Sequence, residues 1–240
     1  WVSSLSFEND IKVDLSFFDI SGESYRKVRN TIRFLLSNIF DLDVSDSKHD
    51  TRDTIINGIP KTSINLFALE ACAKLQQQVH DAYQHFHFKT VHTLLYNFCN
   101  DTLSSLYCST VKDRLYCDHH SSQRRQETQY TIWTILEVLC RLLAPLLPHT
   151  AEEAYSSLYS NPEKSIHLEN VFDLSFSADK NWGIVLQARE TVLKALEVAK
   201  ENGIENSLDA GVILGDPTHQ LAVFKEDLPD LFGVSRVTLS

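Results

Sequence analysis

The chain has 240 residues, of which 43% are hydrophobic and 22% are charged, and this length and composition are typical of a globular protein with a sizeable core. The chain contains only 7 Gly and 6 Pro, and this low number argues against a fold built on many tight turns. A mainly α fold is therefore predicted. The formal net charge of -10 excludes a uniformly basic nucleic-acid binder. A local cluster of Lys and Arg can still bind what the net charge repels.

Membrane insertion and disulfide bonding are not expected. The longest apolar run, residues 135–147, contains Glu137, Arg141 and Pro145 and is too short to span a bilayer. The five Cys form no C-x-x-C pair, and their odd number favours reduced, buried thiols in an intracellular protein. The sequence begins at Trp1 and contains no Met, which predicts that it is a piece of a longer protein.

The first predicted helix separates an apolar face from a basic one. Residues 1–20 are expected to be a linker or short extended segment, and the helix is expected to begin near residues 21–23 and to end near Asn38. Apolar residues recur at helical spacing from Tyr25 to Ile39, so this face is predicted to be buried. The stretch between Arg26 and Arg33 contains no acidic residue. Its polar side chains form an array of donors suited to phosphate oxygens: Arg26, Lys27, Arg29, Asn30 and Arg33.

Further helices are predicted to complete an antiparallel bundle. Residues 41–60 are expected to be a connecting loop that contains at most a short helix. Thr62 or Ser63 is predicted to cap the second long helix. Long helices are then predicted over residues 88–116 and 126–143, the latter at the bundle centre. Thr150 and Glu153 are expected to form a capping box that opens a short helix ending at Leu158.

The character of the sequence changes towards its C-terminus. A helix is predicted over residues 182–202, ending in Asn-Gly, and a helical turn over residues 227–232. Short strands are predicted over residues 208–214, 221–224 and 234–239. The predicted domains are therefore a linker over residues 1–20, a helical domain over 21–162 and a small α+β subdomain over 163–240.

More basic residues flank the turn that joins the third and fourth long helices. Lys112, Arg114, Arg124 and Arg125 are predicted to act together as a phosphate clamp, although some of them could instead complement a helix dipole. Tyr116, in the same region, is a candidate for stacking on unpaired RNA bases. Trp133 lies in a strongly apolar helix and is predicted to belong to the core.

No catalytic or metal-binding constellation is predicted. Four His between His80 and His92 suggest a metal site, but their spacing places only two pairs on shared helix faces, and no carboxylate completes the site. The adjacent Glu152 and Glu153 are explained by a helix N-terminus rather than by acid–base catalysis. We therefore expect no catalytic residue and no cofactor within these 240 residues.

Four motifs in order resemble the isoleucyl-tRNA synthetase family of class I aminoacyl-tRNA synthetases. They are YRKVRNTIRFLL from Tyr25, YNFC from Tyr96, VKDRLYCD from Val111 and RLLAPLLPHTAEEAY from Arg141. The resemblance continues through residues 165–169 and 207–210 and covers nearly the whole chain. It departs at residues 104–110, where the family more usually has an acid before Val111.

The resemblance implies a helical anticodon-binding domain that contacts isoleucine tRNA. It also implies that the parent enzyme uses ATP and Mg in a catalytic domain. This chain lacks the His-x-Gly-His and Lys-x-x-Lys-Ser signatures of that domain. It also lacks the editing domain and the cysteine zinc module that many relatives have. The implied partners are tRNA and the catalytic domain of the same protein. We expect a monomer in the cytoplasm, with a mitochondrial location left open.

Three alternatives stay open from the sequence. The first is a helical scaffold whose basic face docks an acidic protein. The second is the anticodon domain of a related valyl, leucyl or methionyl synthetase. The third is a metal-dependent hydrolase built on the histidines, which would require bound metal.

Overall fold

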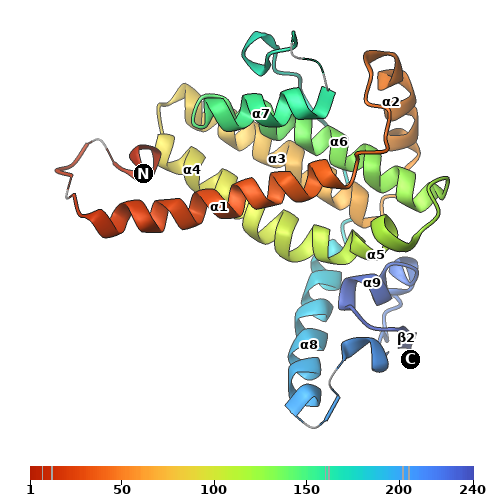
Figure 1. Cartoon of the computed structure of the whole chain (residues 1–240). Helices are drawn as coiled ribbons and strands as arrows, with labels where there is room; N and C mark the ends of the chain where they lie inside the picture. Colours follow the sequence, from red (N-terminus) through yellow and green to blue (C-terminus); the bar gives the residue numbers. More distant parts are fainter. Residues whose placement is uncertain (7, 12, 160, 162, 202, 205) are drawn as a thin grey trace.

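The structure, a computed structural model, describes residues 1–6, 8–11, 13–159, 161, 163–201, 203–204 and 206–240. The predicted domain boundary at Pro162 and the predicted helix end at Asn202 lie outside these residues. The mainly α fold is confirmed. Figure 1 shows a bundle of long helices with a smaller subdomain attached at one end.

The first long helix, α1 (Leu15–Ser37), begins earlier than the sequence suggested. Asp14 caps it, because its carboxylate accepts a hydrogen bond from the Ser16 backbone N–H at 2.8 Å. The prediction of a linker up to residue 20 was wrong, because Asp14 caps the helix and residues 15–20 already belong to it. Leu15 and Ile20 stay 83% and 62% exposed, so burial does not explain the early start of the helix.

Two helices follow before the bundle centre is reached. The predicted loop contains α2 (His49–Gly58), whose Arg52 reaches the buried Glu137. The prediction that Ser63 caps the next helix is confirmed for α3 (Ile64–Gln84), because its hydroxyl accepts a hydrogen bond from the Asn65 N–H at 3.2 Å. Both helices pack against α6 (Gln123–Leu143), which lies at the centre of the bundle.

The third predicted helix is continuous but changes its winding. It consists of α4 (Phe88–Asn97), a π-helical segment (Phe98–Cys108) and α5 (Ser109–Cys117). The hydroxyl of Thr31 on α1 donates to the Cys99 carbonyl at 3.3 Å, inside this segment. A side chain that bonds a helical carbonyl accompanies local rewinding of this kind. The wider segment faces α1, so the change of winding shapes the surface between them.

The centre of the bundle holds the largest aromatic side chain. Trp133 on α6 is fully buried, which confirms its predicted place in the core, and the Arg52 guanidinium lies 4.9 Å from its ring centroid. The next helix, α7 (Pro148–Tyr159), starts before the predicted capping box. That prediction was wrong, because the Thr150 hydroxyl instead hydrogen-bonds the Tyr25 hydroxyl at 3.0 Å. Glu153 faces α1.

The described part of residues 163–181 runs back along the bundle as an extended connection. The Arg141 side chain donates to the Asn170 carbonyl at 2.9 Å, and the Asp179 N–H donates to the Lys61 carbonyl at 2.9 Å. Gln76 holds the same segment by accepting from the Leu174 N–H at 3.1 Å. These contacts attach the connection to α3 and α6.

The α+β subdomain follows this connection. It contains α8 (Trp182–Glu201), α9 (Leu228–Phe232) and two parallel strands, β1 (Gly211–Leu214) and β2 (Arg236–Leu239), with Val212 opposite Val237. The prediction of a strand over 221–224 was wrong. The Asp216 carboxylate accepts from the Gln220 and Leu221 N–H groups and bends the chain into a 3-10 turn, Ala222–Phe224. The predicted helical turn near 227–232 is confirmed as α9, which ends at Gly233 in the left-handed region (φ 65°).

None of the helices in the described ranges combines the length and the apolar character needed to cross a lipid bilayer.

Candidate nucleic-acid interface

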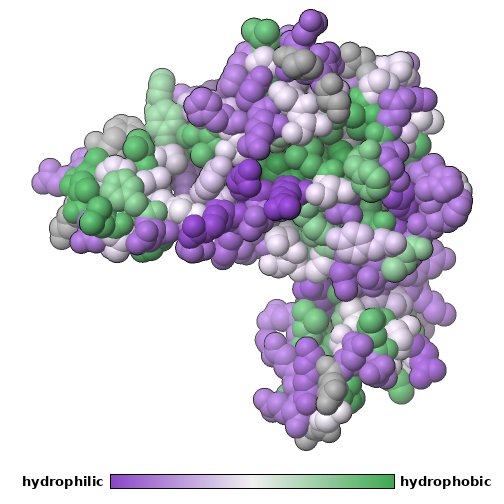
Figure 2. Space-filling view, in the orientation of Figure 1, coloured by the Kyte–Doolittle hydropathy of each residue, from purple (hydrophilic) through white to green (hydrophobic). Residues whose placement is uncertain are grey.

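The exposed face of α1 carries the donor array that the sequence indicated. We call it the α1 ridge and define it by Arg26, Lys27, Arg29, Asn30 and Arg33. All five residues are exposed, whereas Val28, Ile32 and Leu35 on the opposite face are buried. Figure 2 shows strongly hydrophilic side chains along the middle of α1, beside an apolar hollow towards α7. Helical periodicity therefore places the ridge in solvent.

Two ridge residues have carboxylate partners, contrary to the expectation of a ridge without acids. Glu23, three residues earlier on α1, hydrogen-bonds Arg26 and raises the pKa of its guanidinium. Glu153 on α7 approaches Arg29 at 3.4 Å. The sequence pattern missed both partners because one lies just outside the basic stretch and the other comes from a distant helix. Exposed pairs of this kind contribute little to stability, so both cations stay accessible.

The other three ridge residues differ in how they are held. The Lys27 ammonium donates to the Tyr96 hydroxyl at 3.0 Å and lies 5.6 Å from the ring centroid, and this contact raises the pKa of Lys27. For Asn30 and Arg33, no side-chain hydrogen bond or ion pair joins them to any other residue that the structure describes. Their donors face solvent.

The ridge separates two grooves. The α7-side groove, about 590 Å³, is lined by residues that include Arg29, Arg33, Leu36, Phe40, Glu153 and Leu158. The α5-side groove lies on the other side of the helix and is lined by Asn30, Arg33, Phe34, Ser37, Asn38 and Tyr116, and it adjoins a hollow that reaches Lys27 and Lys112. Arg33 lines both grooves. Each groove combines an apolar surface with hydrogen-bonding groups at its edge.

Tyr116 lines the α5-side groove and Lys112 lines the hollow beside it, as a role in RNA binding requires. The Tyr116 ring is 63% exposed and meets the edge of Phe34 at a centroid distance of 6.5 Å. Lys112 is exposed, and its ammonium lies 3.7 Å from the Asp113 carboxylate. Both residues project from the last turns of α5 towards α1. Their role in binding stays a prediction.

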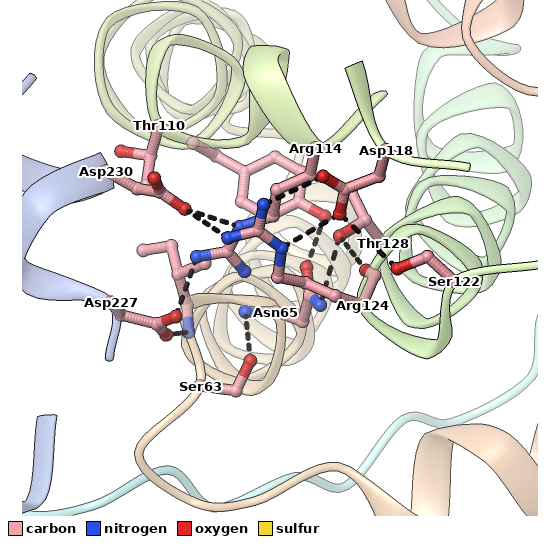
Figure 3. Close-up of polar contacts among 12 residues, drawn as sticks. Ser63, Asn65, Thr110, Arg114, Asp118, Ser122, Arg124, Thr128, Asp227 and Asp230 are labelled. Atoms are coloured by element: carbon pink, nitrogen blue, oxygen red, sulfur yellow. Dashed lines mark hydrogen bonds and ion pairs between the residues drawn. The ribbon is translucent and has the colours of Figure 1, made fainter. Parts of the chain in front are cut away.

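The remaining three arginines do not form the exposed phosphate clamp that their position in the sequence suggested, and Figure 3 shows the surroundings of Arg114 and Arg124. Arg114 is 2% exposed, and its guanidinium contacts Asp227 at 2.7 Å and Asp230 at 2.9 Å. Arg124 is exposed, but its guanidinium bridges two carboxylates, Asp118 at 2.9 Å and Asp230 at 3.2 Å. Arg125 is buried and contacts Asp41 at 2.8 Å. Because carboxylates occupy their donors, we leave these three residues out of the interface.

Arg114 and Arg124 instead attach the C-terminal subdomain to the bundle, whereas Arg125 joins two parts of the bundle. Asp227 and Asp230 belong to the start of α9, and Asp227 also accepts from the Ile64 N–H at 3.2 Å. The hydrogen bonds from Arg124 lower the pKa of Asp118. For Asp41, burial alone would raise the pKa, but hydrogen bonds from Arg125 and Gln129 lower it overall. The set Arg114, Arg124, Asp118, Asp227 and Asp230 is called the subdomain anchor below.

Sequence reasoning missed Phe40 and Glu153, which line the α7-side groove. Phe40 is 82% exposed. An aromatic residue directly after a helix gave no signal of exposure, and Glu153 was assigned to a helix cap. Within the described ranges, no group of three or more His, Cys, Asp or Glu has an arrangement that could hold a metal ion, and this includes the four His between His80 and His92.

Comparison with known proteins identifies the family to which this helical bundle belongs. Residues 66–214 match the model of the family "Anticodon-binding domain of tRNA ligase". The chain belongs to this family, as its sequence motifs indicated.

The curated relatives give the same answer. The chain is 34% identical to the isoleucine--tRNA ligase of Brevibacillus brevis over 99% of its own length, and 36% identical to that of Petrotoga mobilis over 98%. Identity to the Bacillus subtilis isoleucine--tRNA ligase is 34% over the whole chain. In each case the chain spans about a quarter (26%) of the relative's length.

Proposed function

We propose that this chain binds the anticodon stem and loop of isoleucine tRNA through the α1 ridge and the two grooves beside it. The observation that carries the proposal is Arg33, an exposed guanidinium without an intramolecular partner among the described residues, which lies between two grooves with apolar walls. Guanidinium groups suit phosphate oxygens, and exposed aromatic rings suit unstacked bases.

In this proposal the α1 ridge binds phosphates and the grooves bind bases. Arg26, Lys27, Arg29 and Arg33 form a row of donors along α1, which fits the phosphates of one RNA strand and fixes its register. Asn30 and Tyr116 line the α5-side groove and Lys112 lines the hollow beside it, so an unpaired base can be stacked and hydrogen-bonded there. The family and the isoleucine-specific relatives support tRNA as the partner.

The activity of the whole protein is part of this proposal. We infer that the parent protein joins isoleucine to its tRNA in regions outside these 240 residues, as the names of the relatives suggest. The use of ATP and Mg by the parent protein is what the resemblance of the sequence motifs implies. In this proposal the chain supplies binding and selectivity without chemistry or a cofactor of its own, acts within a monomer, and works in the cytoplasm.

The salt dependence of tRNA binding tests the proposal. We expect the dissociation constant for isoleucine tRNA to rise steeply between 50 and 200 mM salt, by about tenfold or more if three or more phosphates are contacted. Valine and methionine tRNAs are the matched controls and should bind more weakly at every salt concentration. An affinity for isoleucine tRNA that hardly changes with salt would contradict the proposal.

A second candidate is a protein-docking surface, because the start of α1 exposes an apolar group next to the ridge. Leu15, Phe18 and Ile20 are 83%, 46% and 62% exposed, and Figure 2 shows apolar side chains gathered there. Charge reversal of Arg29 and Arg33 distinguishes the candidates. Loss of tRNA binding supports the first, whereas intact tRNA binding with loss of a protein partner supports the second.

A further inference from the structure

The geometry points to a more specific arrangement at this interface, which rests on the proposed function. We propose that α1 separates two neighbouring bases of the RNA loop. One base lies in the α5-side groove, the next lies in the α7-side groove, and Arg33 holds the phosphate between them. The inference starts from one observation: Arg33 lines both grooves.

The α5-side groove offers a stacking surface and a reading group. Tyr116 exposes 63% of its surface and makes an edge contact with Phe34, which lines the same groove, so its ring is available for stacking beside the groove. The Asn30 carboxamide lines the same groove and has no side-chain partner among the described residues. A carboxamide carries both a donor and an acceptor, so it can pair with a base edge in two places.

The α7-side groove offers different chemistry. Phe40 stands at its edge and is 82% exposed, while Leu36 and Leu158 supply apolar walls. Glu153 lines the same groove, and its carboxylate only accepts hydrogen bonds. A carboxylate repels phosphate but accepts from the amino group of a base, so this groove suits a base that donates from its exposed edge.

The width of the helix requires the two bases to be unstacked from each other. An α-helix with its side chains is about 10 Å across, so bases on its two sides cannot touch. Each base must then find a stacking partner in the protein, and each groove has an exposed aromatic ring at its edge. The phosphate that joins the two nucleotides must cross the helix, and Arg33 lies at that crossing.

Double-mutant cycles between the chain and its RNA test this arrangement. Isoleucine tRNA is prepared with an abasic nucleotide at one anticodon-loop position at a time and is titrated against the wild-type chain, Tyr116→Ala and Phe40→Ala. Each alanine variant should weaken binding of intact tRNA by about tenfold, the usual effect of losing one base–aromatic stack. Each variant should be insensitive to removal of the one base that it contacts.

The decisive result is which positions couple to which ring. We expect Tyr116 and Phe40 to couple to two different, adjacent positions, while Phe86→Ala, which removes an exposed ring from the turn between α3 and α4, changes nothing. Coupling of both rings to the same base, to non-adjacent bases or to none would overturn the inference. If salt-dependent tRNA binding persists in those cases, the proposed function still stands; if the wild-type chain does not bind tRNA, both fall.

Discussion

The α1 ridge and the subdomain anchor use the same residue type for opposite purposes. Arg26, Arg29 and Arg33 lie on an exposed helical face, where their partners are solvent or one exposed carboxylate. Arg114, at the end of α5, is enclosed by two carboxylates of α9. The difference is made by distant acidic residues, because Asp227 and Asp230 follow Arg114 by more than a hundred positions.

The contrast also predicts different energetic roles. An exposed ion pair contributes little because water solvates both charges well. A buried pair is different: removal of one partner leaves a desolvated charge without compensation. We therefore expect ridge substitutions to change binding and anchor substitutions to change stability.

The largest predicted effect is the loss of stability in Arg114→Ala. The substitution leaves Asp227 and Asp230 without their closest cation and creates a cavity, so the free energy of unfolding should fall by roughly 3–5 kcal/mol. Urea denaturation measures this change. The matched control is Arg236→Ala, which removes an exposed arginine from the same subdomain and should change stability by less than about 0.5 kcal/mol.

A second variant separates loss of charge from loss of volume at the anchor. Asp227→Asn keeps the shape of the side chain but removes the charge that faces Arg114. It should be destabilising by a smaller amount than Arg114→Ala, because Asp230 still compensates the guanidinium. Equal stability of Arg114→Ala and the wild type would show that the anchor does not hold the subdomain.

The next effect concerns tRNA affinity and the ridge. The double variant Arg29→Ala/Arg33→Ala should weaken binding of isoleucine tRNA by about one to two orders of magnitude and should lower the salt slope by about 2, one for each lost phosphate contact. Fluorescence anisotropy at several salt concentrations measures both quantities. Lys89→Ala/Lys225→Ala removes the same charge from exposed positions elsewhere and is the control. An unchanged slope in the ridge variant would show that these arginines do not contact phosphates.

A smaller effect is a pH dependence located in the anchor. Hydrogen bonds from Arg124 lower the pKa of Asp118 below its usual 3.8. A carboxyl group with a lowered pKa in the folded state adds stability that is present above pH 3.8 and is lost as the pH falls through the folded-state value. Asp118→Asn should therefore cost roughly 1 kcal/mol at pH 6 and less at pH 3. A pH-independent difference between the two proteins would contradict this account.

Features that depend on strong local signals could be predicted from the sequence. Features that depend on contacts between residues far apart in the sequence could not. The buried face of α1, the Ser63 cap and the core position of Trp133 follow from periodicity and capping. The burial of Arg114 and Arg125 does not follow from these local signals, because their carboxylate partners come from the start of α9 and from the turn after α1. The grooves could not be predicted either, because each needs two helices that are far apart in sequence.

The smallest predicted effect is that of Arg26→Ala, which contrasts with Arg114→Ala because it removes an exposed rather than a buried arginine. Arg26→Ala removes an exposed guanidinium whose only ion pair among the described residues is to Glu23 on the same helix. Its thermal midpoint should equal that of the wild type, because Glu23 becomes solvated when its partner is lost. Binding of tRNA should weaken by less than about tenfold, since Arg26 lines neither groove and would contribute one phosphate contact. A clear drop in the thermal midpoint would mean that the ridge, like the anchor, stabilises the fold, and the division between the two regions would then fail.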